Sequence, residues 1–199
     1  NQKLPPQSTF KVPNALIGLQ TGVVSGEDHL KKWDGQISSY SAHNRDHTLA
    51  SAIQHSVVWY FQDIARNVGM HRMQEWINQV GYGNKDISGG IDCFWLESSL
   101  RISPIEQVDF IEKLYKEDLP FNKHVTQTVK KMITVKQDDS FVLAGKTGTR
   151  NNLGGGWFVG YMSYREKTYA FATYIDGPNA SGPKAREITE NIIYGELIK

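Results

Sequence analysis

The sequence contains very little cysteine and no long apolar run. Cys93 is the one cysteine among 199 residues, so no disulfide can form within the chain and cysteine content does not identify the redox compartment. No apolar stretch is long enough to cross a bilayer, and residues 1–7 lack the apolar core of a signal peptide. An export signal that was removed beforehand is compatible with this pattern.

An excess of charge of one sign is also missing. The 22 lysine and arginine residues balance 21 aspartate and glutamate residues, and the basic residues are scattered. We therefore expect no nucleic-acid partner and no contact of this segment with a membrane.

Internal repeats are absent, and a hydrophobic content of 39% is enough for a packed core, so we predict one domain over residues 1–199. The oligomeric state stays open.

The central part of the chain has helical patterns. Apolar residues at helical spacing predict helices over 58–68 and 70–80. Another helix should begin at Pro104, because Ser103 can cap it and Glu106 completes a capping box. Its expected buried stripe consists of Ile105, Val108, Ile111, Leu114 and Tyr115.

After a further helix over 124–135, the pattern changes to strands. Aromatic and β-branched residues predict strands at 141–144, 157–164 and 168–175. A C-terminal helix should then pack on the sheet through Ile188, Ile192 and Ile193.

These elements predict an α+β fold, with an antiparallel sheet flanked by helices. The sheet and C-terminal helix should occupy about 139–199, and a mainly helical subdomain about 22–138. Three strands make a thin sheet for this much helix. We therefore expect one or more strands N-terminal to Asn1 to be missing from this chain.

Ser8 and Lys11 form the first candidate catalytic pair, because side chains three residues apart lie on one face of a helical turn. A serine nucleophile needs a base within hydrogen-bond reach, and a desolvated lysine can supply one. Such a pair alone is often a helix cap and a solvated charge. The run Lys146-Thr147-Gly148-Thr149 can add a cation, a hydroxyl and backbone donors on the other wall of a cleft. Together they indicate an active-serine acyl transferase acting on β-lactams or peptidoglycan-like peptides.

The order of several motifs adds a specific resemblance. The motifs are Ser8-Thr9-Phe10-Lys11, Ser56-Val57-Val58, Tyr82-Gly83-Asn84, Phe94-Trp95-Leu96-Glu97 and Lys146-Thr147-Gly148. In these motifs the chain resembles the class D (OXA-type) serine β-lactamases, whose superfamily includes β-lactam-sensor domains and penicillin-binding proteins. The resemblance extends from Ser8 to the last helix. It implies a serine β-lactamase/penicillin-binding transpeptidase-like fold.

The resemblance implies hydrolysis of the β-lactam ring through an acyl-enzyme on Ser8. It also implies that CO2 carboxylates Lys11 and that the resulting carbamate acts as general base, with no other cofactor. This is physically reasonable, because burial lowers the pKa of a lysine and only the neutral amine attacks CO2. Trp95 would hydrogen-bond to the carbamate, and Val58 and Leu96 would form an apolar wall.

The remaining roles also follow from the resemblance. Ser56 would relay a proton to the lactam nitrogen, Lys146 would attract the substrate carboxylate, and Thr147 would hydrogen-bond to it beside Gly148. The backbone N–H groups of Ser8 and Thr149 would form the oxyanion hole. A β-lactam substrate further implies a secreted, periplasmic or cell-surface location.

One position departs from the family. Many members carry an arginine three residues before an Ile-Thr pair, and counting back from Ile188-Thr189 gives Ala185. Lys184 and Arg186 flank it, each about 100° away on a helix. We expect carboxylate anchoring to be weaker, or to fall to Arg186 or Thr147.

Three other functions compete. A β-lactam-sensor domain would acylate without turnover; Val58 argues against it, because sensors tend to have asparagine there, whereas Ala185 and Lys-Thr-Gly-Thr look sensor-like. A penicillin-binding transpeptidase has no need of the pocket around Trp95. A non-catalytic relic is the third.

His43 and His47 have a spacing that suits a metal, but we expect solvated histidines and no metal site.

Overall fold

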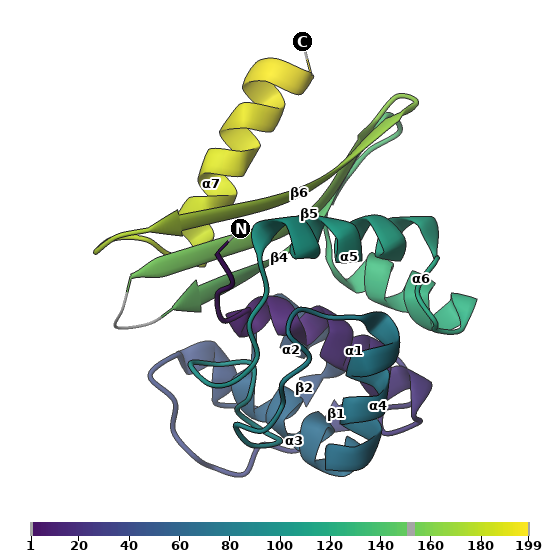
Figure 1. The fold of residues 1–199 in the computed structure, drawn as a ribbon, viewed down its shortest axis with the longest axis vertical. Helices are drawn as coiled ribbons and strands as arrows, with labels where there is room; N and C mark the ends of the chain where they lie inside the picture. Colours follow the sequence, from purple (N-terminus) through teal and green to yellow (C-terminus); the bar gives the residue numbers. More distant parts are fainter. Residues whose placement is uncertain (1, 151–153, 199) are drawn as a thin grey trace.

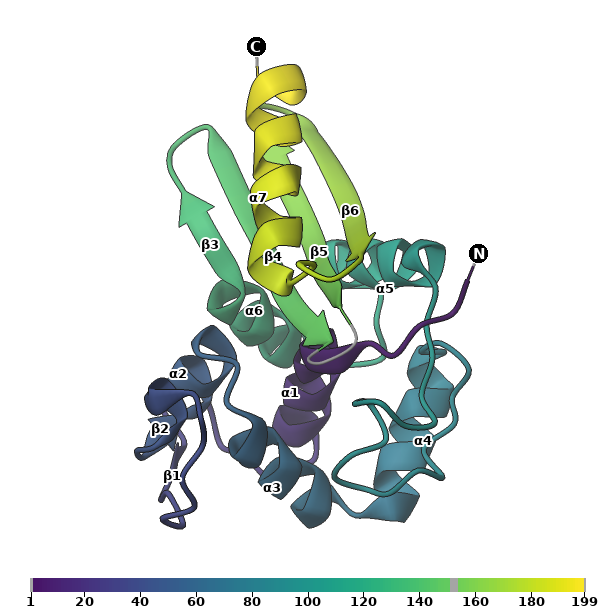
Figure 2. The same cartoon turned by 90° about the vertical axis from the view of Figure 1, so that its left-hand side faces the viewer.

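The computed structural model describes residues 2–150 and 154–198, and its fold has two lobes (Figure 1). One lobe is an antiparallel sheet in the order β3-β4-β5-β6. Its strands are Thr134–Gln137, Phe141–Arg150, Gly155–Tyr164 and Lys167–Asp176. Helix α7 (Gly182–Ile192) covers one face, and α5 (Pro104–Lys116) lies against the other face (Figures 1 and 2). The predicted α+β fold is confirmed.

The other lobe is built around α1 (Lys11–Gln20), which buries every residue from Lys11 to Gly18. Around it lie α2 (Leu49–Gln54), α3 (Val58–Val68), α4 (Met70–Val80), α6 (Lys123–Met132) and a short ribbon of β1 (Leu30–Lys31) with β2 (His47–Thr48). The largest hydrophobic core surrounds α1 and continues under the sheet. A helix so completely buried gives its polar residues an apolar environment, and Lys11 is one of them.

Several local predictions are confirmed. Helices α3 and α4 have the predicted bounds. Helix α5 begins with the predicted capping box, in which Glu106 N donates to Ser103 Oγ at 3.2 Å and Ser103 N donates to the Glu106 carboxylate at 2.8 Å. These features depend on neighbours in sequence, which explains why the sequence alone predicts them.

Two predicted bounds are wrong. The helix predicted over 124–135 ends at Met132, and Thr134–Gln137 forms strand β3 against β4, so the sheet begins before residue 139. The strand predicted over 141–144 continues to Arg150, because β5 pairs with it as far as Arg150↔Gly155. The Lys146-Thr147-Gly148-Thr149 run therefore lies within a strand.

Two predicted helix faces are partly wrong. Ile105 is 57% exposed and Ile192 is 54% exposed, whereas Ile111, Leu114 and Ile193 are buried as predicted. Helix α5 also buries Gln107 and Phe110. Helix α7 packs on the sheet through Gly182, Ala185 and Thr189, followed by Ile193. Small residues at these positions let α7 approach the sheet closely.

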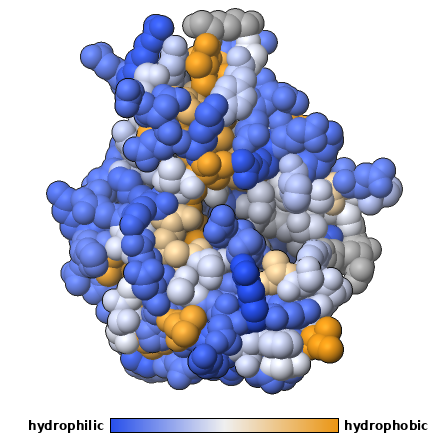
Figure 3. Space-filling view, turned by 180° about the vertical axis from the view of Figure 1, so that it is seen from behind, coloured by the Kyte–Doolittle hydropathy of each residue, from blue (hydrophilic) through white to orange (hydrophobic). Residues whose placement is uncertain are grey.

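Among the described residues, nine large apolar side chains are exposed. The face seen from behind is mainly hydrophilic, with small separate apolar groups (Figure 3). Among the helices of residues 2–150 and 154–198, none is both long and apolar enough to cross a membrane. The expected strands N-terminal to Asn1 concern residues outside this chain and stay a prediction.

Candidate active site

Ser8 and Lys11 meet at the junction of a 3-10 turn and helix α1. The turn covers Gln7–Phe10 and continues directly into α1, so the two side chains lie on the same side. Lys11 Nζ donates to Ser8 Oγ at 2.6 Å. Ser8 is partly exposed, whereas Lys11 is fully buried and its Nζ lies 5.7 Å from the centre of the Phe61 ring. A hydroxyl open to solvent thus contacts a buried amine.

The environment of Lys11 disfavours its charged form. Burial lowers its pKa well below the usual value near 10.5, and the positive charge of Lys146 lowers it further. Lys11 is therefore a neutral amine at a lower pH than an exposed lysine is, and a neutral amine can accept a proton or react with CO2.

Lys146 and Ser56 form a second pair on the opposite wall. Lys146 Nζ donates to Ser56 Oγ at 3.1 Å and to the Thr147 carbonyl oxygen at 3.0 Å. Burial lowers the pKa of Lys146 to about 7. Ser56 lies in the turn between α2 and α3 with a left-handed φ of 58°, a conformation that costs free energy in a non-glycine residue.

Strand β4 passes close to the Ser8 turn. A Cβ on Gly148 would lie 3.1 Å from the Pro6 carbonyl oxygen and 3.2 Å from Thr9 Cγ2, so glycine allows this approach. Within the described residues, β3 pairs with β4 only as far as Ala144. The N–H of Gly145 donates to the Ile133 carbonyl oxygen at 2.8 Å, and the following residues Thr147 and Thr149 line the cavity. The N–H of Gly182 donates to Thr149 Oγ1 at 2.9 Å, which connects this edge to the start of α7.

These walls enclose a cavity of about 200 Å³. Its lining residues are Ser8, Tyr40, His43, His55, Ser56, Val58, Thr147, Thr149 and Pro183. The cavity thus brings together predicted site residues from three segments distant in sequence, namely Ser8, Ser56 with Val58, and Thr147 with Thr149. No aspartate or glutamate is among these lining residues, and the buried ammonium of Lys146 contacts one of them, Ser56.

Trp95 lies in the core behind the reactive pair. Its indole is fully buried and stacks on Phe10, the neighbour of Lys11, with centroids 5.4 Å apart. Within the described part of the chain, its Nε1–H has no hydrogen-bond partner. Buried donors are rarely left unpaired, so this N–H is suited to a further acceptor. Leu96, the next residue, is partly buried and packs against the same core.

The Tyr82-Gly83-Asn84 motif organises the backbone near Trp95. Arg101 N donates to Asn84 Oδ1, and Asn84 Nδ2 donates to the Ser99 carbonyl oxygen, both at 2.9 Å. Gly83 has a left-handed φ of 56°, and a Cβ there would lie 2.2 Å from the Arg101 carbonyl oxygen. The motif is therefore structural here and lies outside the lining of the Ser8 cavity.

Arg186 lies outside that cavity. Its Nε donates to Glu190 Oε1 at 2.7 Å, and its guanidinium lies over the Phe158 ring. It lines an adjoining cavity of about 190 Å³, which also touches Lys146 and Thr147. Ala185 is fully buried against the sheet, so a longer side chain has no room there.

The expectation of solvated histidines is wrong. His43 is 7% exposed and His47 is 1% exposed. His43 Nε2 donates to the His55 carbonyl oxygen at 3.0 Å, and His47 Nε2 donates to the Ala42 carbonyl oxygen at 2.8 Å. Among the described residues no group of three or more His, Cys, Asp or Glu side chains could hold a metal ion.

Sequence reasoning missed the cavity wall formed by Tyr40, His43 and His55. The position of His55 directly before the Ser56 motif was a usable signal for one of them. Tyr40 and His43 belong to the polar stretch before α2, where nothing in the local pattern indicates which side chains turn inward.

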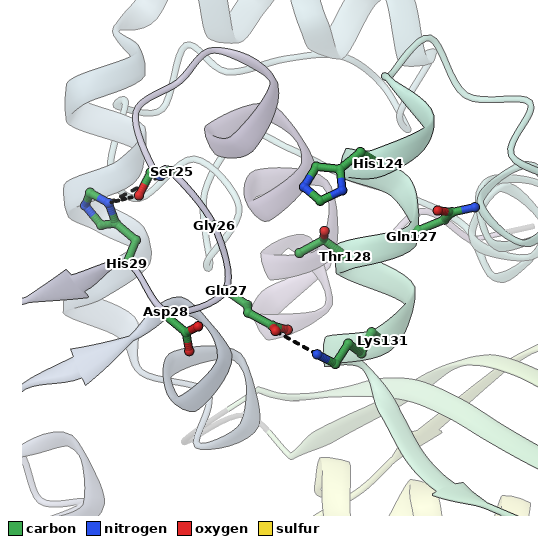
Figure 4. A pocket seen from close by; sticks show the side chains of 9 residues that line it. All are labelled: Ser25, Gly26, Glu27, Asp28, His29, His124, Gln127, Thr128 and Lys131. Atoms are coloured by element: carbon green, nitrogen blue, oxygen red, sulfur yellow. Dashed lines mark hydrogen bonds and ion pairs between the residues drawn. The ribbon is translucent and has the colours of Figure 1, made fainter.

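A larger cavity of about 590 Å³ lies elsewhere, between residues 25–29 and helix α6 (Figure 4). Two of its charged lining groups, Glu27 and Lys131, pair with each other at 2.7 Å. Ser25 Oγ lies 3.1 Å from His29 Nδ1 in an exposed pair. The lysine in this lining, Lys131, is 71% exposed, so among the described residues no buried lysine lies beside Ser25. The smaller cavity beside Ser8 is therefore the better candidate active site, because it combines a nucleophile with a buried amine.

Comparison with known proteins agrees with this geometry. The family described as "Penicillin binding protein transpeptidase domain" matches residues 1–194. The chain is 52% identical over 194 residues to the "Probable beta-lactamase YbxI" of Bacillus subtilis (strain 168), covering 97% of this chain and 72% of that protein. It is also similar to the solved structure of "Class D beta-lactamase BAT-2", with a TM-score of 0.96 and 51% identity over 100% of this chain and 83% of that chain.

A signalling protein is similar as well. The "Regulatory protein BlaR1" of Bacillus licheniformis is 38% identical over 192 residues, which cover 94% of this chain and 32% of that protein. The chain therefore belongs to the penicillin binding protein transpeptidase domain family, in the group formed by class D β-lactamases and the related receptor sensor domains.

Proposed function

We propose that this protein is a class D serine β-lactamase, which hydrolyses the β-lactam ring of penicillin-type antibiotics and thereby gives resistance. The observation that carries the proposal is the 2.6 Å contact between Ser8 Oγ and the buried Nζ of Lys11 in a cavity without carboxylates. Identity of 52% to a probable β-lactamase supports the same activity.

Ser8 is the proposed nucleophile. Its Oγ attacks the lactam carbonyl carbon and loses its proton to the base at Lys11, while the C–N bond of the ring breaks. Ser56 lies between Lys146 and the cavity and passes a proton to the leaving nitrogen. The backbone N–H groups of Ser8 and Thr149 stabilise the negative charge on the carbonyl oxygen. Water then cleaves the ester on Ser8 and restores the hydroxyl.

A carbamate on Lys11 fits the residues around it. The pKa of Lys11 is lowered by burial, and the Trp95 indole N–H lacks an acceptor among the described residues. When present, a carbamate supplies an anionic general base for both acylation and deacylation. Trp95 would hold it by a hydrogen bond, while Val58 and Leu96 limit access of water.

Lys146 and Thr147 are proposed to bind the substrate carboxylate. Thr147 lines both adjoining cavities, whereas Lys146 lines only the one of about 190 Å³, where its ammonium is a buried cation close to Ser56. Gly148 lets this strand approach Ser8. Arg186 adds positive charge from the adjoining cavity, although its pairing with Glu190 limits its direct role.

A receptor sensor domain that acylates without turnover is the second candidate, because BlaR1 is similar over most of the chain. Val58 favours the hydrolase, since an apolar side chain in the lining protects a carbamate better than a polar one. Either function needs a protein outside the cytoplasm, so we also propose a secreted, periplasmic or cell-surface location.

The test is hydrolysis of a chromogenic cephalosporin with and without added bicarbonate. We expect sustained turnover that bicarbonate increases and that Lys11→Ala abolishes. The matched control is Lys131→Ala, which removes a 71% exposed lysine and should leave turnover unchanged. One stoichiometric burst at Ser8 without further turnover would contradict the hydrolase and support the sensor domain.

A further inference from the structure

Glu97 connects three segments that surround the reactive pair. Arg150 Nε donates to Glu97 Oε1 at 2.8 Å, and the side-chain amide of Gln7 donates to the same oxygen. Gln7 directly precedes Ser8, Arg150 directly follows Thr149, and Glu97 lies two residues after Trp95. One carboxylate oxygen thus joins the nucleophile turn, the end of β4 and the tryptophan loop.

The contact with Gln7 supports an unfavourable backbone conformation. Gln7 has a left-handed φ of 53°, which a residue with a Cβ rarely adopts without support from its surroundings. Its backbone N–H donates to the Trp95 carbonyl oxygen at 3.0 Å, and its side chain is held by Glu97. Both supports come from the same loop. The direction in which the chain enters the Ser8 turn therefore depends on the position of that loop.

The contact with Arg150 supports the other side of the cavity. Arg150 is the last residue of β4, and its partner Gly155 begins β5. The side chains of Arg150 and Glu97 are 27% and 37% exposed, so their pairing is partly shielded from solvent. A charge-assisted bond here restrains the strand end that carries Thr149.

We propose that Glu97 is a positioning residue for the active site. By holding Gln7 and Arg150, its carboxylate sets the Ser8 and Thr149 backbone N–H groups and the Trp95 indole relative to Lys11. Glu97 does not line the Ser8 cavity, so it acts through these neighbours and not on the substrate. The inference rests on the proposed function.

The test compares Glu97→Gln with the wild type in three measurements. Because displacements of about 1 Å can change rates a hundredfold, we expect kcat to fall at least tenfold with KM changed less than threefold. We expect the bicarbonate concentration that half-saturates the Lys11 carbamate, followed by 13C NMR with labelled bicarbonate, to rise about fivefold. The thermal unfolding midpoint should shift by less than 4 °C.

A double variant provides the rescue. Glu97→Arg combined with Arg150→Glu restores the ion pair, and the Gln7 amide can bond to either charge because it has both a donor and an acceptor. This variant should recover most of the lost kcat, whereas Glu97→Arg alone should not. The matched control is Glu112→Gln, which removes an ion pair with Lys116 on the exposed side of α5 and should leave all three measurements unchanged.

Wild-type kcat and wild-type carbamate occupancy in Glu97→Gln would overturn the inference. A double variant no better than Glu97→Arg would also overturn it, since the ion pair would then not be the cause. If the wild type acylates without turnover, the proposed hydrolase fails, but carbamate occupancy and acylation rate still test the role of Glu97.

Discussion

The indole of Trp95 stacks on the ring of Phe10, with ring planes inclined by 22° and centroids 5.4 Å apart. Phe10 is adjacent to Lys11 in sequence, so this stacking ties the tryptophan to the segment that carries the buried amine. The indole N–H nevertheless has no acceptor within the described residues. The stacking needs only the aromatic ring of Trp95, so the buried indole N–H is a fixed hydrogen-bond donor that the packing does not use.

Trp95→Phe should keep the stacking and remove the donor. We expect the bicarbonate concentration needed for half-maximal carbamate formation to rise about tenfold, because a hydrogen bond to a charged group contributes roughly 1.5 kcal/mol. The measurement is 13C NMR with labelled bicarbonate. Trp76→Phe is the matched control, since Trp76 stacks on Phe121 at 18° away from the cavity. Equal bicarbonate dependence in both variants would contradict the role of the indole.

Lys11→Met should abolish hydrolysis and stabilise the fold. A buried amine without a carboxylate partner costs free energy that a thioether of similar length does not. We expect the free energy of unfolding to increase by about 1–3 kcal/mol in urea titrations. The control Lys131→Met changes an exposed lysine and should stay within about 0.5 kcal/mol of the wild type. A less stable Lys11→Met protein would show that Lys11 contributes net stability.

Lys146 should make stability depend on pH. Its pKa is lowered from 10.5 to about 7 by burial, so between these values the unfolded chain binds more protons than the folded protein. The free energy of unfolding should therefore rise with pH from about 7 upward, and the burial cost is fully present below pH 7. Urea titrations from pH 6 to 9.5 measure this slope.

The slope should be smaller in Lys146→Met, and the remainder comes from Lys11, whose pKa is lowered in the same direction. An unchanged slope in Lys146→Met would show that Lys146 does not titrate in this range. A stability that falls with pH in the wild type would reverse the predicted sign.

Ala185→Arg should destabilise the protein and not improve substrate binding. Ala185 is fully buried where α7 packs on β5, so a guanidinium there must displace the helix or lose its hydration. We expect a loss of roughly 3 kcal/mol in the free energy of unfolding. Lys184→Arg is the control, because Lys184 is exposed and pairs only with Glu187 among the described residues. A stable variant with a lower KM would show that this position can anchor the carboxylate.

Local chemistry explains what could be predicted from sequence. The capping box of Ser103 and Glu106, the helix over 58–68 and the three-residue spacing of Ser8 and Lys11 each involve neighbours within one helical turn. Such contacts are determined by backbone geometry that short sequences encode. Strand β3 was missed because four residues with weak alternation become a strand only by pairing with β4.

By itself the sequence determined the α+β class and the start of the helix at Ser103, and it predicted Ser8 and Lys11 as candidate site residues. The tertiary structure decided the surroundings of those candidate residues. It buries Lys11, brings Lys146 to Ser56 across 90 residues, leaves the Trp95 donor unpaired among the described residues, and joins Gln7, Glu97 and Arg150. The physical reason is that desolvation and long-range hydrogen bonds depend on packing between segments that local sequence patterns do not specify.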